Sequence, residues 1–130
     1  MFSHVAVGTN DLEKAKQFYD AVLGALGYDE GVNDDNEHRR RYVYRTDTGI
    51  FIITEPLNRL PASHANGGTI GFACESIEQV DRWHAAGITN CGTSVEAPPG
   101  MRGASSGRLY LAYLRDPDGN KLCALYREPA

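Results

Sequence analysis

The feature that most constrains the fold of this chain is an internal repeat. The segment HVAVGTNDLEKAKQF, beginning at His4, aligns without gaps with TIGFACESIEQVDRW, beginning 65 residues later at Thr69. Apolar residues match along this alignment, pairing Val5 with Ile70, Val7 with Phe72, Leu12 with Ile77, and Phe18 with Trp83. Each copy starts as a short alternating strand and continues as a helix. The alternative interpretation is chance similarity between two amphipathic strand–helix units.

Both copies also carry helix-end signals. The capping-box pairs are Asn10 with Glu13 and Ser76 with Gln79. A glycine in the left-handed conformation commonly ends a helix, so we expect the first helix to stop near Gly24 or Gly27 and the second at Gly87.

A second match follows at a spacing of 70 residues. RTDTG, at 45–49, lies over RDPDG, at 115–119, and each separates two runs rich in tyrosine, valine, isoleucine or leucine. Such runs around turn residues indicate β-hairpins. The predicted element order is β-α-β-β-β, twice, and the agreement of two separate registers makes chance the weaker interpretation. The Pro-, Asn- and Gly-rich segment between the copies is a predicted linker.

Strand alternation predicts which face of each sheet meets its helix. Val5 and Val7 share the face beneath the first helix, which leaves His4 on the opposite face with small residues. The second copy repeats this pattern, with Thr69 in the position of His4. Small side chains leave space for a cleft, and clefts between repeats commonly bind ligands. We therefore expect His4 and Thr69 at the lip of a cleft.

Composition excludes several classes of function. A net charge of −4 argues against nucleic-acid binding, and no apolar stretch is long enough to span a membrane. The N-terminal segment lacks the features of a secretion signal. Three cysteines without CxxC spacing favour reduced thiols, and we predict a cytoplasmic protein. With 130 residues we expect a single domain over 1–130, with module one at about 1–55, a linker at 56–67 and module two at 68–130.

Four segments give the chain a family resemblance: HVAVGTNDLEKAKQFYDAVLGALGY, NGGTIGFAC, APPGMR and RDPDGNKLCALYR. Together they span nearly the whole chain, and it resembles the vicinal oxygen chelate superfamily, which includes glyoxalases, bleomycin-resistance proteins and extradiol dioxygenases. The resemblance implies an α+β fold of two βαβββ modules in tandem, each a half-barrel of mixed sheet with a helix on its outer face. It also implies a small-molecule ligand and a homodimer.

In this superfamily a divalent metal binds to residues of the first and last strands of each module. Carried over by resemblance, these metal positions are His4, Thr69, Ile53 and Cys123, the last two lying four residues after each turn glycine. The superfamily usually has His or Glu there, and His4 alone conforms. Zinc, nickel, manganese or iron would need three or more strong donors, so the predicted cofactor is one of these metals held by a degenerate set, or none.

Two classes of function follow. The leading hypothesis is a glyoxalase-like protein that binds a small polar or aromatic metabolite in a barrel cleft and acts as a divalent-metal-dependent lyase or dioxygenase. The alternative is a metal-free protein that binds or sequesters a small molecule, as in bleomycin resistance. A weaker hypothesis makes Cys123 a nucleophile activated by His4, against its interpretation as a small buried apolar residue.

Other residues are candidates for binding substrate. Arg102 lies in the APPGMR segment, interpreted as a mobile loop bordering the cleft, where it would hold an anion. Arg41 ends a basic run that would meet an anionic substrate or pair with the acidic residues just before it. Tyr110 and Tyr113 lie on opposite faces of one strand, so one should line the cleft and the other the core. The DPDG turn itself is interpreted as structural.

Overall fold

A computed structural model describes residues 1–104 and 107–129 of the chain, and it confirms the predicted order of elements. The first half contains β1 (His4–Gly8), α1 (Leu12–Ala25), β2 (Val32–Asn33), β3 (Arg41–Arg45) and β4 (Ile50–Thr54). The second half contains β5 (Ile70–Ala73), α2 (Ile77–Thr89), β6 (Thr93–Ala104), β7 (Gly107–Arg115) and β8 (Lys121–Arg127). No helix in the described ranges is long and apolar enough to cross a membrane.

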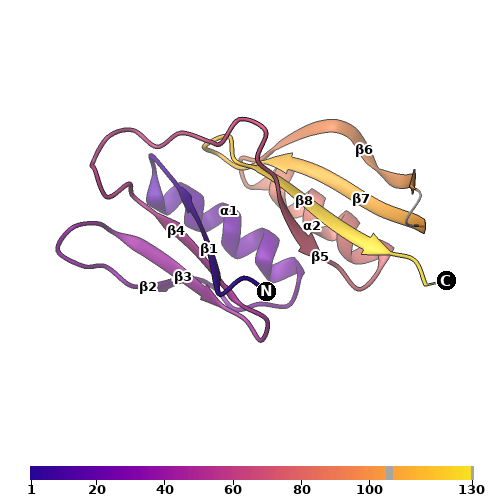
Figure 1. Cartoon of the computed structure of the whole chain (residues 1–130), viewed down its shortest axis with the longest axis horizontal. Coiled ribbons are helices and arrows are strands. Elements are labelled where there is room, and N and C mark those ends of the chain that lie inside the picture. The colour runs from indigo at the N-terminus through magenta and orange to yellow at the C-terminus, as the bar shows by residue number, and fades with distance from the viewer. Residues whose placement is uncertain (105–106, 130) are drawn as a thin grey trace.

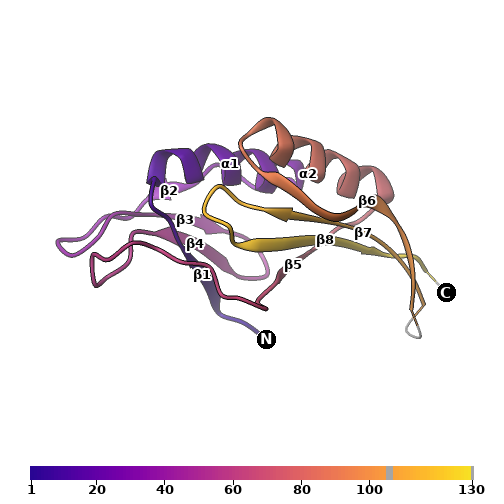
Figure 2. The ribbon, with the colours of Figure 1, turned by 90° about the horizontal axis from the view of Figure 1, so that it is seen from above.

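The strands form two mixed sheets of four strands each. Their orders are β1-β4-β3-β2 and β5-β8-β7-β6, with β1 parallel to β4, β5 parallel to β8, and antiparallel pairing elsewhere. The sheets lie side by side, with β1 and β5 at their facing edges, and both helices cover the same side of this layer (Figures 1 and 2). The expected fold class, two βαβββ modules in tandem, is therefore confirmed.

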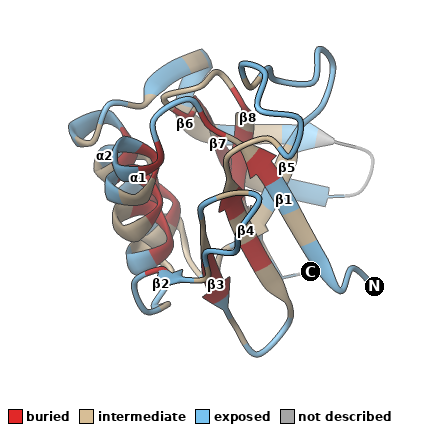
Figure 3. Ribbon diagram, turned by 90° about the vertical axis from the view of Figure 1, so that its left-hand side faces the viewer, coloured by how far each residue is buried: buried red, intermediate tan, exposed pale blue. Residues whose placement is uncertain are grey.

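One continuous core lies between the helices and the sheets (Figure 3). Val7 and, in part, Val5 join it, which confirms the predicted faces of β1. Aromatic rings connect the two modules across the seam between β1 and β5, since the Phe51 and Phe72 ring centroids are 5.7 Å apart. Phe72 also packs against Trp83 of α2, at 6.4 Å. Because the core crosses the seam, the two modules stabilise one another.

The first helix does not use its predicted cap. Asp11 is the N-cap of α1, where its carboxylate accepts a hydrogen bond from the Lys14 backbone. Asn10 is engaged elsewhere: its side chain exchanges two hydrogen bonds with the backbone of Ala62 in the linker. The Ser76 cap of α2 is confirmed by a 3.1 Å bond from the Gln79 N–H.

The predicted C-terminal end is right for α1 and wrong for α2. Gly27, with φ of 91°, follows the end of α1 and closes it, as predicted. In contrast, α2 continues past Gly87 to Thr89, and Cys91 takes the left-handed conformation with φ of 72°. Gly87 serves packing instead, because a Cβ there would lie 2.3 Å from the Leu114 Cδ1 atom on β7.

The segment predicted as a mobile loop around Arg102 belongs to β6. The pairing of β6 with β7 shifts between Val95 and Gly100, so four residues, 96–99, lie opposite the single residue Ala112. This wide bulge contains two prolines, which have no N–H to donate to a ladder. The bulge bends β6, and Arg102 lies on regular strand beyond it.

The two hairpin turns differ in length by one residue. The turn between β3 and β4 spans residues 46–49, whereas the turn between β7 and β8 spans 116–120. The longer turn is built around the buried Asp116 carboxylate, which accepts hydrogen bonds from the Asp118 N–H, from Asn120 and from the Tyr19 hydroxyl. These contacts support the structural interpretation of the DPDG turn.

Candidate functional site

A cleft of about 290 Å³ opens at the seam between β1 and β5, here called the seam cleft. Its walls are mostly apolar and reach the core residues Leu23 and Phe51. His4 lines it from the exposed start of β1, and the Ser3 hydroxyl lies 2.8 Å from its Nδ1 atom. Gly71 and Ala73 of β5 line it on the other side. His4 therefore borders a cleft with Gly71 and Ala73 as small neighbours, whereas Thr69, its expected partner, does not line this cleft.

Thr69 lies at the other end of the same seam. A second cleft of about 290 Å³ there is lined by Gly8 and Thr69. His4 therefore neighbours the end of β5, whereas Gly8 neighbours its beginning, so the two strands run in opposite directions. Four residues of strand correspond to about 13 Å, which separates the predicted partners His4 and Thr69 along the seam.

Cys123 lines neither of these two clefts and lies on the face of β8 that points away from the helices. It is 6% exposed and is the register partner of Tyr113 on β7. Burial raises the pKa of the Cys123 thiol, and a hydrogen bond with the Tyr113 hydroxyl opposes this in part. A nucleophilic cysteine needs the opposite shift. The pairing of Cys123 with His4 stays a prediction that this raised pKa does not favour.

Polar side chains surround this thiol. Lys121 stacks over the Tyr113 ring, with its ammonium 4.8 Å from the ring centroid, and forms an ion pair with Glu96. Arg102 is also close enough to lower the pKa of Cys123 slightly, while its guanidinium donates to the Pro98 carbonyl at 3.0 Å. We call Cys123, Tyr113, Lys121, Glu96 and Arg102 the thiol cluster.

Sequence reasoning missed two members of the thiol cluster. Lys121 could have been found, because it precedes Cys123 by two residues and so shares its face. Glu96 left no such signal, since it reaches Lys121 from within the bulge of β6, in a left-handed conformation with φ of 58°.

The position assigned to Ile53 needs a correction. Ile53 is fully buried in the core and faces the helices. Ile52 pairs with Ala6 as Cys123 pairs with Gly71, so Ile52 is the structural equivalent of Cys123. The count of four residues from the turn glycine failed because the first turn is one residue shorter. Either isoleucine offers a hydrocarbon and no metal donor.

The donor chemistry of these positions does not fit a divalent metal within one chain. The set offers one imidazole, one neutral hydroxyl, one protonated thiol and one hydrocarbon, and its members occupy separate places on the sheets. Among the residues that the structure describes, no three His, Cys, Asp or Glu side chains cluster as a metal site. Metals of the predicted kinds require three or more strong donors.

The remaining candidates face in different directions. Tyr110 points toward the helices, where its hydroxyl donates to Asp81 of α2 at 2.7 Å, and Tyr113 takes the opposite face. Tyr110 is therefore the core-side tyrosine of the pair. Arg41 forms a forked contact with Asp34, at 2.7 and 3.0 Å, so the predicted internal pairing of the basic and acidic runs is present.

Comparison with known proteins places this geometry in a family. A family model described as the glyoxalase/bleomycin resistance protein/dioxygenase superfamily matches residues 1–124. A crystal structure of a glyoxalase/bleomycin resistance protein from Albidiferax ferrireducens T118 is 61% identical, with a TM-score of 0.91, and the match covers 98% of this chain and 99% of that one. No match is found among curated proteins.

More distant structures share the fold. A glyoxalase/bleomycin resistance protein/dioxygenase family enzyme from Burkholderia phytofirmans PsJN is 18% identical, with a TM-score of 0.70 and coverage of 97% and 98%. A lactoylglutathione lyase from Agrobacterium tumefaciens is 21% identical, with a TM-score of 0.65 and coverage of 97% and 92%. The repeat, the two mixed sheets and the family match agree: this chain belongs to the glyoxalase/bleomycin resistance protein/dioxygenase superfamily.

Proposed function

We propose that this protein binds a small aromatic metabolite in the seam cleft without a metal held by the chain alone. The observation that carries the proposal is the lining of the cleft, which combines apolar walls with a single exposed imidazole, His4, at the rim. Ligand sites typically combine apolar walls with a few placed polar groups. A volume of about 290 Å³ suits a ligand of one ring.

The position of His4 gives the ligand an orientation. Its Nδ1 atom lies 2.8 Å from the Ser3 hydroxyl, which leaves Nε2 as the ring nitrogen available to a ligand. A phenol hydroxyl at the rim would bond to Nε2 while the ring occupies the apolar interior. Sequestration of this kind is the alternative that the family resemblance already offered.

We further propose a homodimer in the cytoplasm. The faces of the sheets that point away from the helices expose Gly71 and Ala73, and a second copy would cover them. The three cysteines are free thiols, which is consistent with a reducing compartment. Sedimentation velocity tests the dimer directly, and a single monomeric species at micromolar concentration would refute it.

The test of the binding proposal uses phenol and catechol as probes, titrated into isotopically labelled protein and followed by amide chemical shifts. Gly71→Leu should fill the seam cleft without a clash, because a Cβ at Gly71 meets nothing within 4 Å. Gly103→Leu is the matched control, since Gly103 on β6 has equal space and lies outside the cleft.

We expect shifts at β1 and β5 in the wild type, their loss in Gly71→Leu and their retention in Gly103→Leu. His4→Ala should weaken catechol binding by about tenfold, the value of one good hydrogen bond. Unchanged binding in Gly71→Leu would overturn the proposal.

A metal-assisted lyase or dioxygenase is the second candidate. The observation that favours it is the hydrogen-bonded, exposed imidazole of His4, since metal-ligating histidines are commonly oriented through their other ring nitrogen. Because this chain supplies too few strong donors, a second copy would have to add them. Elemental analysis of protein purified without chelator tests this candidate: near-stoichiometric metal, lost in His4→Ala, would support it over the metal-free binder.

A further inference from the structure

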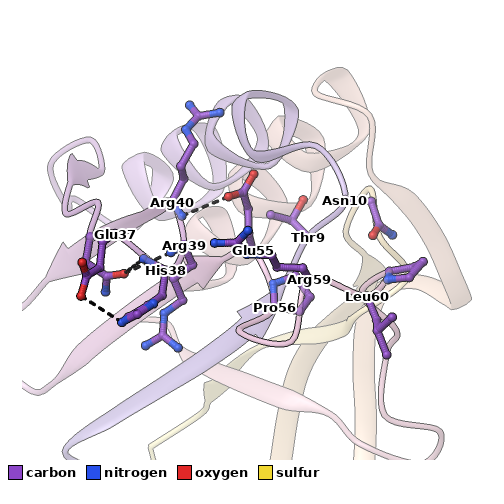
Figure 4. A pocket seen from close by; sticks show the side chains of 12 residues that line it. Thr9, Asn10, Glu37, His38, Arg39, Arg40, Glu55, Pro56, Arg59 and Leu60 are labelled. Atoms are coloured by element: carbon purple, nitrogen blue, oxygen red, sulfur yellow. Dashed lines mark hydrogen bonds and ion pairs between the residues drawn. The ribbon is translucent and has the colours of Figure 1, made fainter.

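A further cleft lies away from the seam, at the far end of β1. It has a volume of about 540 Å³ and opens between the hairpin residues 36–40 and the linker residues 55–61. Figure 4 shows the hairpin side chains on the left and the linker side chains on the right. We call it the hairpin cleft. Thr9 and Asn10, which follow β1, complete its lining.

The charged side chains of the hairpin cleft are three arginines and two glutamates. Arg40 is already engaged, because its guanidinium pairs with Glu13 at 3.1 Å and lies 3.9 Å from Asp35. The two glutamates are engaged as well. Glu37 contacts the His38 ring at 3.2 Å, and Glu55 accepts the Arg40 backbone N–H at 3.0 Å.

Arg39 and Arg59 are different. Within the described ranges, neither guanidinium has an ion pair or a hydrogen bond. The Nε–H of Arg39 is sealed from solvent and still has no partner. A buried donor on a charged group is costly to leave unsatisfied, and a turn of the Arg39 side chain toward an anion in the cleft would satisfy it.

The linker presents Arg59 from a strained backbone. Arg59 has φ of 62°, a left-handed conformation that side-chain-bearing residues rarely adopt, and its N–H closes a turn on the Pro56 carbonyl at 3.0 Å. Strain of this kind concentrates at sites of function. The wall of the cleft beside Arg59 is apolar, because it is formed by Pro56, Leu60 and Pro61.

We propose that the hairpin cleft is a second binding site, for a small organic acid with an apolar body. Arg39 and Arg59 hold the carboxylate, and the apolar body lies against Pro56 and Leu60. This site is separate from the one proposed above. Five residues of strand lead from His4 to Thr9, about 17 Å, so one small ligand does not occupy both clefts.

Benzoate is the probe, titrated into the full chain by calorimetry, with inorganic phosphate as the comparison anion. The variants are Arg39→Met and Arg59→Met, which keep an unbranched, flexible side chain and remove the charge. Arg45→Met is the matched control, because Arg45 is an exposed arginine at the opposite end of β3, outside the cleft. Thermal melts establish that each variant folds.

We expect each cleft variant to weaken benzoate binding by about tenfold or more, as the loss of a charge-assisted contact predicts, and Arg45→Met to change it less than twofold. Phosphate should bind more weakly than benzoate, since it has no apolar body. Equal binding by wild type and both cleft variants would overturn the proposal, as would tighter binding of phosphate.

The seam variant separates the two proposals. Gly71→Leu blocks the seam cleft and should leave benzoate binding unchanged. Loss of benzoate binding in Gly71→Leu would place the acid in the seam cleft and refute a second site, whereas a failure of phenol binding alone would leave this proposal intact.

Discussion

Replacing Gly87 by alanine should destabilise the protein, although alanine is the better helix former. A Cβ at Gly87 would lie 2.3 Å from Leu114 Cδ1 and 3.3 Å from atoms of both Phe18 and Val22. Leu114 is fully buried and cannot swing into solvent. Overpacking of this kind costs about 1–3 kcal/mol, and the gain in helix propensity returns up to about 1 kcal/mol. The expected net loss is up to about 2 kcal/mol.

The other helix supplies the control. Gly24 lies near the end of α1, and a Cβ there meets nothing within 4 Å, so Gly24→Ala should stabilise the fold by about 0.5–1 kcal/mol. Urea denaturation followed by circular dichroism measures both changes, and a thermal melt should shift by about 3–5 °C per kcal/mol for a chain of this size. Replacing glycine by alanine should therefore lower the free energy of unfolding in α2 and raise it in α1. If Gly87→Ala were as stable as Gly24→Ala, the close packing of α2 against β7 would be disproved.

Three further outcomes follow from the contacts. Tyr19→Phe removes a 2.6 Å hydrogen bond to the buried Asp116 carboxylate and should cost about 1.5–3 kcal/mol in urea denaturation; an unchanged midpoint would contradict this. Iodoacetamide at pH 8 should modify the exposed Cys91 well before Cys123, whose pKa burial raises, and mass spectrometry would expose equal rates as a refutation. Burial raises the pKa of Cys74 from 9.0 to about 11, so the unfolded chain releases this proton first and stability should fall between pH 9 and 11. Cys74→Ala should flatten that fall, and an identical slope would argue against it.

The local features of the fold could be predicted because they depend on neighbouring residues. Alternation placed Val5 and Val7 against the helix, and the turn chemistry of Gly27 ended α1. Ser76 capped α2 through its own hydroxyl. Each of these depends on contacts within a few residues.

The failures came from contacts between distant parts of the chain. Asn10 is of a residue type that commonly caps helices, yet its side chain hydrogen-bonds to the backbone of Ala62 in the linker. No rule based on neighbouring residues specifies this long-range contact. Gly87 resembles a stop signal and instead makes room for Leu114. The bulge before Arg102 resembled a loop because its prolines interrupt the strand pattern.

The candidate site was predicted in part. His4 lines a cleft and Tyr113 contacts Cys123, whereas Tyr110 faces the helices, and the roles of these residues in binding or catalysis stay predictions. Which of these residues lie close together was not predictable, because that depends on the relative direction of β1 and β5 along the seam. Two copies related by such a reversal place equivalent residues at opposite ends of the seam, and sequence alignment carries no information about that reversal.

The unequal hairpin turns have a practical consequence for redesign. A protein engineer who wished to restore a carboxylate to the first module would count residues from the turn glycine and select Ile53, where a glutamate would be a buried, unpaired charge. Ladder partners select Ile52 instead, on the open side of β4, opposite Ala6. One extra residue in a surface turn leaves the hydrogen-bonded ladder intact and yet decides which of two adjacent isoleucines can accept a new ligand.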